Sequence, residues 1–153
     1  MTRWSAFAAD VPELAAFAEA RLHAAPAYLA TVRADGSPRV HPVTPILGGG
    51  GLYLFMEPNS PKGRDLRERR SFAMHNGVPD SEGTGGEVWI AGRGDPVDDV
   101  ATRAEVVAAA SYVPDDRYVL FELSVREVRC NGYGDVTLPS VTRWKSPDPA
   151  DAG

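Results

Sequence analysis

Apolar residues follow two different periods along this chain, and the change comes near residue 26. In the first part they recur at three- and four-residue intervals: Val11, Leu14, Phe17, Ala18 and Leu22. This spacing predicts a helix with one apolar face. Asp10 and Glu13 have the spacing of a capping box, so the helix is predicted to begin at Asp10. It is predicted to end at Pro26 because proline cannot continue a helix.

Short apolar stretches separated by glycine and proline follow, and they predict strands. The predicted strands cover residues 28–33, 39–47, 52–56, 71–75, 87–94 and 118–124, and residues 125–133 either continue the last strand or pair with it. Asp35-Gly36 is a typical hairpin turn between the first two strands. Pro42 and Pro45 predict that the second strand is an interrupted edge strand. Further helices are predicted over residues 62–70 and after a cap at Asp98 or Asp99.

Strands joined by hairpins, with helices between them, predict a mainly β protein built as a closed antiparallel barrel with peripheral helices. The 153 residues fit one domain, which we place at 1–145, followed by a tail at 146–153 whose composition predicts disorder. We expect a cytoplasmic protein with no membrane partner, because the N-terminus lacks the apolar core of a signal peptide and no stretch of about 18 apolar residues exists. A single cysteine, Cys130, excludes a disulfide within the chain.

The formal net charge is −5, which argues against nucleic acid as a partner. This charge is unevenly distributed along the chain. Residues 62–70 hold five basic and two acidic residues, whereas residues 71–116 hold two basic and nine acidic ones. An acidic chain with one basic segment suits a ligand that carries a phosphate.

The basic segment begins where a loop turns into a predicted helix, and it contains Ser60, Lys62, Gly63 and Arg64. A helix N-terminus offers free N–H groups and a positive dipole end, which favours phosphate binding, and lysine and arginine add full charges. The alternative is a solvated basic helix with no ligand. A second candidate is the predicted strand 39–44, because a ligand could lie along a backbone that Pro42 partly frees from pairing.

Several short segments together resemble the flavin-binding split-barrel superfamily of pyridoxamine 5′-phosphate oxidase-like proteins. Residues 30–43 resemble its opening hairpin, and Ser60-x-Lys62-x-x-Asp65-Leu66 resembles its phosphate-binding segment. Residues 87–94 resemble a later strand of the family, and Arg143-Trp144 resembles a C-terminal pair found in some members. In this order they span about residues 10–145.

The resemblance implies a homodimer of six-stranded split barrels, with FMN in grooves at the dimer interface. Arg39 and Lys62 would contact the phosphate with help from Ser60, and Arg64 is the candidate to replace a second basic residue of the family that is Pro61 here. Glu87 falls where the oxidases have a glutamine that reaches the flavin ring, and Trp144 would close the groove. The flavin would also be lined by the backbone of Val40, His41, Pro42, Val43 and Thr44, and by Phe55 and Met56.

The predicted function is an FMN-dependent oxidoreductase acting on a small-molecule substrate. The short branch of the superfamily that the chain resembles also includes proteins that use a deazaflavin coenzyme or bind heme. A deazaflavin-dependent reductase and a non-catalytic flavin- or heme-binding protein are therefore the alternatives, with His41 or His75 as the axial ligand in the heme case. The three histidines and Cys130 do not have metal-ligand spacing, so no metal site is predicted.

Overall fold

The computed structural model describes residues 2–148, in which two helices are followed by eight strands with two further helices between them. The helices are α1 (Trp4–Asp10), α2 (Pro12–Ala24), α3 (Pro61–Arg69) and α4 (Val100–Ala109). The strands are β1 (Ala27–Val32), β2 (Pro38–Val43), β3 (Ile46–Gly48), β4 (Gly51–Met56), β5 (Ser71–Asn76), β6 (Glu87–Val97), β7 (Val119–Asn131) and β8 (Arg143–Lys145).

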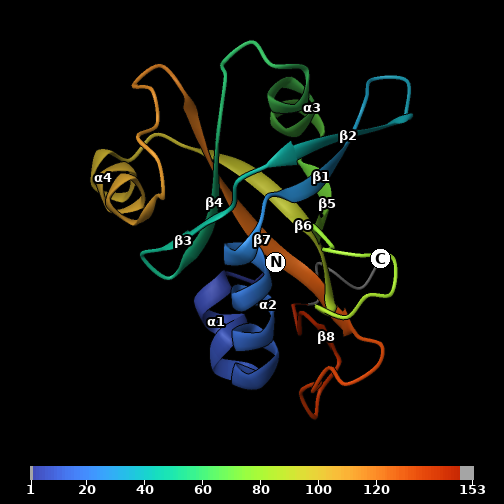
Figure 1. Ribbon diagram of the computed structural model, residues 1–153. Helices are drawn as coiled ribbons and strands as arrows, with labels where there is room; N and C mark the ends of the chain where they lie inside the picture. Colours follow the sequence, from blue (N-terminus) through green and yellow to red (C-terminus); the bar gives the residue numbers. More distant parts are fainter. Residues whose placement is uncertain (1, 149–153) are drawn as a thin grey trace.

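All the strands belong to one antiparallel sheet with the order β2-β1-β5-β6-β7-β4-β3, and β8 pairs with β7 beyond β4 (Figure 1). The mainly β, split-barrel fold is thus confirmed. Within residues 2–148 the end strands β2 and β3 do not pair with each other, so the sheet is a curled half-barrel rather than a closed barrel. In the described part of the chain, the three-residue strands β3 and β8 bring the number of strands to eight instead of the six expected.

The curl depends on the two longest strands, β6 and β7, which pair along their whole length except at one bulge between Ala91 and Gly92. A bulge bends the strand and increases its local twist. The other edge of β7 pairs first with β4 and later with β8. Thr2 forms a bridge to Val125 between these two partners, so the start of the chain fills the gap.

The helices cover different parts of this sheet (Figure 1). The main core lies between the concave face and α1 and α2, and includes Phe7, Leu14 and Leu29. Strand β4 is buried on both faces: Leu52, Leu54 and Met56 point into the main core, while Tyr53 and Phe55 join a smaller core with Val106 of α4. No helix within residues 2–148 is long and apolar enough to cross a membrane.

The start of the chain differs from the prediction. Residues 4–10 form a separate helix, α1, and the N-cap of α2 is Val11, which makes no side-chain capping bond. The predicted capping box is therefore wrong. The Asp10 carboxylate instead accepts a hydrogen bond from Trp144 Nε1 at 2.6 Å, and Glu13 Oε2 accepts one from Ser140 Oγ at 3.0 Å. A buried indole N–H needs an acceptor, and Asp10 supplies it.

Most other predicted elements are confirmed, with changes at their ends. The predicted strand 39–47 divides into β2 and β3 at its prolines, and residues 118–133 are mainly one continuous strand. Asp99 caps α4 by accepting a hydrogen bond from the N–H of Thr102 at 2.7 Å. Most of the tail predicted to be disordered, residues 149–153, lies outside the described residues; Ser146 N–H donates to the Arg126 carbonyl at 2.8 Å.

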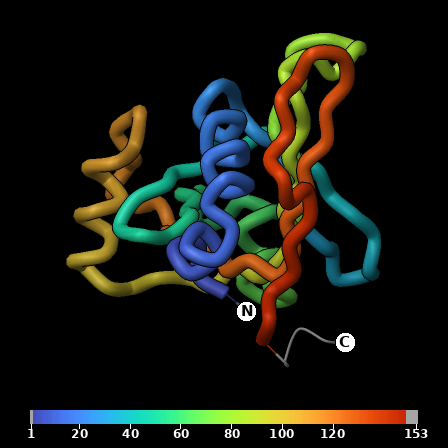
Figure 2. The backbone as a smooth tube through the Cα atoms, turned by 90° about the horizontal axis from the view of Figure 1, so that it is seen from below, coloured from blue at the N-terminus to red at the C-terminus, as the bar shows by residue number. Residues whose placement is uncertain are grey.

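The segment between β7 and β8 runs back beside the β5–β6 loop, residues 77–86 (Figure 2). The two segments touch where Gly83 lies against the ring of Tyr133, so closely that a Cβ at residue 83 would be 2.6 Å from it. The neck of the β5–β6 loop is held by Asn76, whose side chain donates to the carbonyls of Gly77 and Gly86 and accepts from Val88 N–H.

Candidate functional site

The N-terminus of α3 is built as the sequence predicts. Ser60 is the N-cap, and its Oγ accepts a hydrogen bond from Gly63 N–H at 3.2 Å. Pro61 occupies the first position of the helix, where its missing N–H has no consequence. Gly63 is buried on the end of β4, and a Cβ at this residue would lie 2.8 Å from Ser60 Oγ and 3.6 Å from Met56 Cβ. This contact brings the Lys62 turn close to the end of β4.

The edge strand β2 provides the second part of the site. Arg39 pairs with Thr31 and His41 pairs with Leu29 in the sheet register, which places both on the concave face. Val40 and Pro42 lie on the convex face, where the Val40 side chain is 61% exposed. His41 lies within electrostatic range of Lys62, Arg39 and Arg33. The two predicted segments, 39–44 and 60–64, are thus brought together.

A buried aspartate of α3 links these elements. Asp65 Oδ2 accepts hydrogen bonds from Arg39 Nε at 2.8 Å and from Thr31 Oγ1 at 3.0 Å, and Oδ1 accepts one from Arg69 Nη2 at 3.2 Å. These three donors hold the pKa of Asp65 below its ordinary value even though burial acts to raise it. Arg69 Nε also donates to the Val32 carbonyl at 2.6 Å. Helix α3 is thereby fixed to β1 and β2.

Two cations of this cluster keep donors that are not engaged in hydrogen bonds. Among residues 2–148, Lys62 forms no ion pair, and the Nη nitrogens of Arg39 have no hydrogen-bond partner. Lys62 lies in the first turn of α3, whose N-terminal end carries partial positive charge, and Arg39 is tied to Asp65 one turn further along the helix. The geometry and charge of the cluster suit an anion with several oxygens, such as a phosphate.

The other predicted site residues lie apart from this cluster or serve the core. Trp144 is 6% exposed and packs on Phe7 with ring centroids 5.0 Å apart, as a core residue does. Glu87 lies on the same face of β6 as Trp89. This is the convex face of the sheet, opposite to the face that holds Arg39. Phe55 is buried under Arg103, whose Cζ is 4.9 Å from the ring centroid. Arg64 and Thr44 are exposed, and Val43 packs against the main core.

Three residues of the site were not predicted, namely Asp65 as a link, Thr31 and Arg69. Asp65 appears in the motif that the sequence presents, but its partners on β2 and β1 are 26 and 34 residues away. Two carboxylates, Asp65 and Glu68, in a basic helical segment were the available signal, and nothing local distinguishes the one that turns inward.

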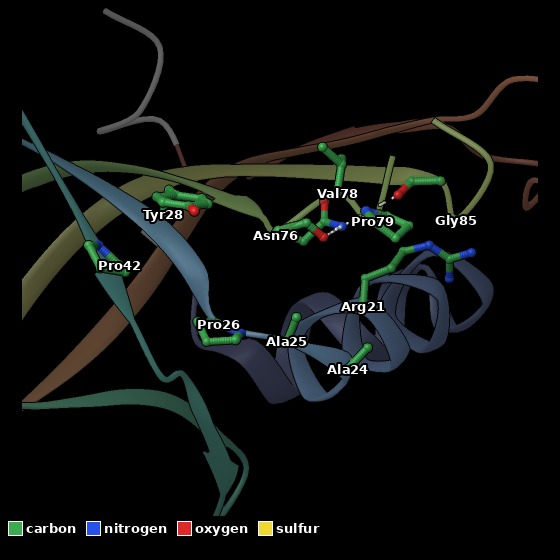
Figure 3. A pocket seen from close by; sticks show the side chains of 12 residues that line it. Arg21, Ala24, Ala25, Pro26, Tyr28, Pro42, Asn76, Val78, Pro79 and Gly85 are labelled. Atoms are coloured by element: carbon green, nitrogen blue, oxygen red, sulfur yellow. Dashed lines mark hydrogen bonds between the residues drawn. The ribbon is translucent and has the colours of Figure 1, made fainter. Parts of the chain in front are cut away.

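A groove of about 600 Å³ opens on the other side of β2 (Figure 3). Its wall is mostly apolar and is formed by the end of α2, by Tyr28 and Pro42, and by the β5–β6 loop. Arg21 is the one charged residue among those that line it. The Arg21 guanidinium lies over the Phe17 ring, with Cζ 3.3 Å from the centroid, and Nη1 donates to the Phe17 carbonyl. Its buried Nε has no hydrogen-bond partner in the described part of the chain.

The convex face of the sheet is partly uncovered. Register places Pro42, Tyr28, His75 and Trp89 side by side across β2, β1, β5 and β6. Tyr28 is 51% exposed there. Together with Val40, these side chains give the exposed face an apolar centre.

A sequence profile described as pyridoxamine 5′-phosphate oxidase matches residues 12–131. The chain belongs to this family. The match includes β2, the end of β4 and the whole of α3, and so covers the Arg39–Lys62 cluster. The predicted membership of the oxidase-like split-barrel superfamily is therefore confirmed. A comparison with curated proteins gives no match.

Solved structures of similar fold include proteins that bind different cofactors. A heme binding protein from Mycobacterium smegmatis is 26% identical, with a TM-score of 0.62 over 83% of this chain and 57% of that chain, so this chain spans little more than half of that protein. An FAD binding protein from the same organism is 14% identical, with a TM-score of 0.61 over 76% and 93% of the two chains. The heme storage protein HutZ from Vibrio cholerae is 17% identical, with a TM-score of 0.60 over 80% and 95%. At these identities the last two indicate the fold alone.

The environment of His41 predicts how the stability of this oxidase-family chain depends on pH. Burial, and then the charges of Lys62 and Arg39, hold the pKa of His41 below its ordinary value. The unfolded chain therefore binds this proton at a higher pH than the folded chain does, and the free energy of unfolding falls as the pH drops below about 6.5. Replacing His41 by glutamine should make that fall smaller, as measured by urea unfolding at about pH 7.5 and pH 5. An equal fall in both proteins would contradict this account of His41.

Proposed function

We propose that this chain is a flavin-dependent oxidoreductase that holds FMN at the Arg39–Lys62 cluster. The observation that carries the proposal is a pair of cations with free donors, Lys62 in the first turn of α3 and Arg39 on the edge strand β2, which Asp65 ties to that helix. The edge of β2 that faces away from β1 leaves backbone groups available to a ligand. Membership of the oxidase family adds support.

In this assignment Arg39 and Lys62 bind the phosphate, and Ser60 orders the turn that presents Lys62. The backbone from Val40 to Thr44 lies along the ribityl chain and the ring. FMN supplies the hydride chemistry when bound, and the protein binds and orients it and limits the access of water. A deazaflavin coenzyme has the same ribityl phosphate and is the alternative ligand of this site.

The first test is the absorbance spectrum of the purified protein, followed by titration with FMN, with a deazaflavin and with riboflavin. We expect FMN to bind at least about tenfold more tightly than riboflavin, because the cluster contacts the phosphate. Failure to bind either FMN or the deazaflavin would contradict the proposal. Turnover is tested by adding NAD(P)H and then an electron acceptor, and a bound flavin that responds to neither would indicate a storage protein.

Heme binding is the second candidate, and one feature of His75 favours it. His75 Nδ1 lies 2.7 Å from the Asn76 carbonyl oxygen, an arrangement that fixes the ring and leaves Nε2 for a metal. A heme binding protein is also among the similar structures. A Soret band on heme titration that is lost in His75→Ala would support this candidate. A titration without such a band would dismiss it.

We propose a homodimer in which the convex face around Val40, Tyr28 and Trp89 meets the same face of a second copy. Exposed apolar side chains of neighbouring strands are favourable to bury, and a self-complementary contact with two-fold symmetry is the commonest arrangement. Sedimentation should give the mass of two chains. Replacing Val40 by glutamate should raise the dimer dissociation constant about tenfold or more, because an unpaired polar group in an interface costs about 1–3 kcal/mol. A monomeric wild type would contradict the dimer.

The groove beside Pro42 is our proposed substrate space. It shares Pro42 with the strand that would line the flavin, so a molecule bound there would lie next to the ring. Its apolar wall and the guanidinium of Arg21 suit a small apolar molecule with an acidic group. The affinities of a panel of aromatic acids and of their amides for the flavin-loaded protein test this preference. We expect each acid to bind more tightly than its amide.

A further inference from the structure

Among residues 2–148, Asp65 is the one carboxylate that forms an ion pair with a cation of the proposed phosphate site, and that cation is Arg39. It is 5% exposed, and both of its oxygens are used, by Arg39 and Thr31 at Oδ2 and by Arg69 at Oδ1. A carboxylate beside a phosphate repels it, so an aspartate at this position needs a reason.

We infer that Asp65 is a positioning residue that makes the site select phosphorylated over unphosphorylated flavin by fixing the Arg39 guanidinium. The inference rests on the proposed function, because it needs a phosphate at the Arg39–Lys62 cluster. It adds a role for a side chain that touches no ligand itself.

The geometry at Arg39 carries the inference. Asp65 takes the Nε–H of Arg39, which leaves the outer Nη1 and Nη2 end free to act as a fork. A planar fork can give two parallel hydrogen bonds to a phosphate when its orientation is set in advance. The Arg39 side chain is 22% exposed, and within residues 2–148 its hydrogen-bond partner is Asp65, which therefore fixes the direction of the guanidinium.

The carboxylate is in turn fixed from two other elements. Thr31 holds it from β1, and Arg69 holds it from the next turn of α3 while donating to the Val32 carbonyl. The orientation of Arg39 is therefore coupled to the packing of α3 on the sheet. This is the helix that also presents Lys62, so the element that holds the Arg39 guanidinium is the one that carries the second cation of the proposed site.

Positioning and simple electrostatics predict opposite results for Asp65→Asn. Removal of the negative charge strengthens the positive field of the cluster, so electrostatics alone predicts tighter binding of FMN. Positioning predicts weaker binding, because an amide holds Arg39 less firmly than a carboxylate does. Riboflavin has no phosphate, so its affinity is an internal reference that reports damage to the rest of the proposed flavin site.

The experiment measures dissociation constants of FMN and riboflavin for the wild type, Asp65→Asn and Asp95→Asn. Asp95 is a matched control because it too is paired with arginines, Arg70 and Arg93, but is outside the site. We expect Asp65→Asn to weaken FMN binding about tenfold, with riboflavin unchanged, and Asp95→Asn to change neither. Tighter FMN binding, or equal losses for both flavins, would overturn the inference.

A second pair of variants tests whether the effect passes through Arg39. In an Arg39→Ala background, Asp65→Asn should not lower the ratio of FMN affinity to riboflavin affinity further, because the guanidinium that Asp65 positions is absent. A further drop in that ratio would overturn the inference. If Asp65→Asn does not fold, Arg39→Lys is measured in its place, since lysine keeps the charge but has no planar fork. An affinity ratio of FMN to riboflavin equal to that of the wild type would then overturn the inference. A wild type that does not distinguish FMN from riboflavin would instead refute the proposed phosphate site itself.

Discussion

Replacing Gly92 by alanine is expected to lower the free energy of unfolding by about 3 kcal/mol or more, the upper end of the cost of overpacking. A Cβ at this residue would lie 1.9 Å from the Ser124 carbonyl oxygen and 3.2 Å from the Arg126 nitrogen. Both are backbone atoms of β7, so no side chain can rotate away to make room. Urea or thermal unfolding of the purified variant measures the change.

The clash coincides with the bulge between Ala91 and Gly92, where β7 has one extra residue, Arg126, opposite β6. Relief of the clash would move the two central strands apart and weaken the longest ladder of the sheet. Gly36→Ala is the control: Gly36 has φ of +83° but no atom within 4 Å of a built Cβ, so its cost is conformational only, about 1–2 kcal/mol. Equal losses in the two variants would show that the close approach at Gly92 has no special weight.

Local sequence patterns predict most of the strands of this fold but not the curl of the sheet. The strands and α3 follow from apolar period, proline and glycine, because these act over a few residues. The curl of the sheet depends on the pairing of Gly92 with Val125, and α1 depends on contacts of Phe7 with Trp144, far along the chain. Asp10 was misassigned for a related reason, since its partner Trp144 is 134 residues away.

The candidate site likewise contains residues that local sequence predicts and residues that only the three-dimensional packing reveals. Ser60 and Lys62 could be predicted because a cap, a proline and a cation at a helix start are neighbours in sequence. The interrupted strand 39–44 was a candidate from its residues, but the role of Arg39 at a phosphate came from the family motif, since a lone arginine on an edge strand has no specific local signal. That Asp65 would take the Nε of this arginine follows from the three-dimensional packing of α3 on β1 and β2.

Replacing Lys62 by alanine is expected to weaken FMN binding by about 1.5–3 kcal/mol, the contribution of a hydrogen bond to a charged group, or about 12- to 150-fold in the dissociation constant. Lys62 has no ion pair among residues 2–148, so its removal leaves no buried charge without a partner. The effect on stability should therefore be small. Titration followed by flavin fluorescence or absorbance measures the constant.

Arg67→Ala is the matched control, because it removes one positive charge from an exposed position of the same helix. A general loss of positive field would weaken FMN binding in both variants, and the loss would shrink at high salt. If Lys62 contacts the phosphate directly, FMN binding is weakened far more in Lys62→Ala than in Arg67→Ala. The riboflavin affinities of the two variants are then equal. Equal FMN affinities in wild type and Lys62→Ala would remove Lys62 from the phosphate site and leave Arg39 as the cation that the proposal depends on.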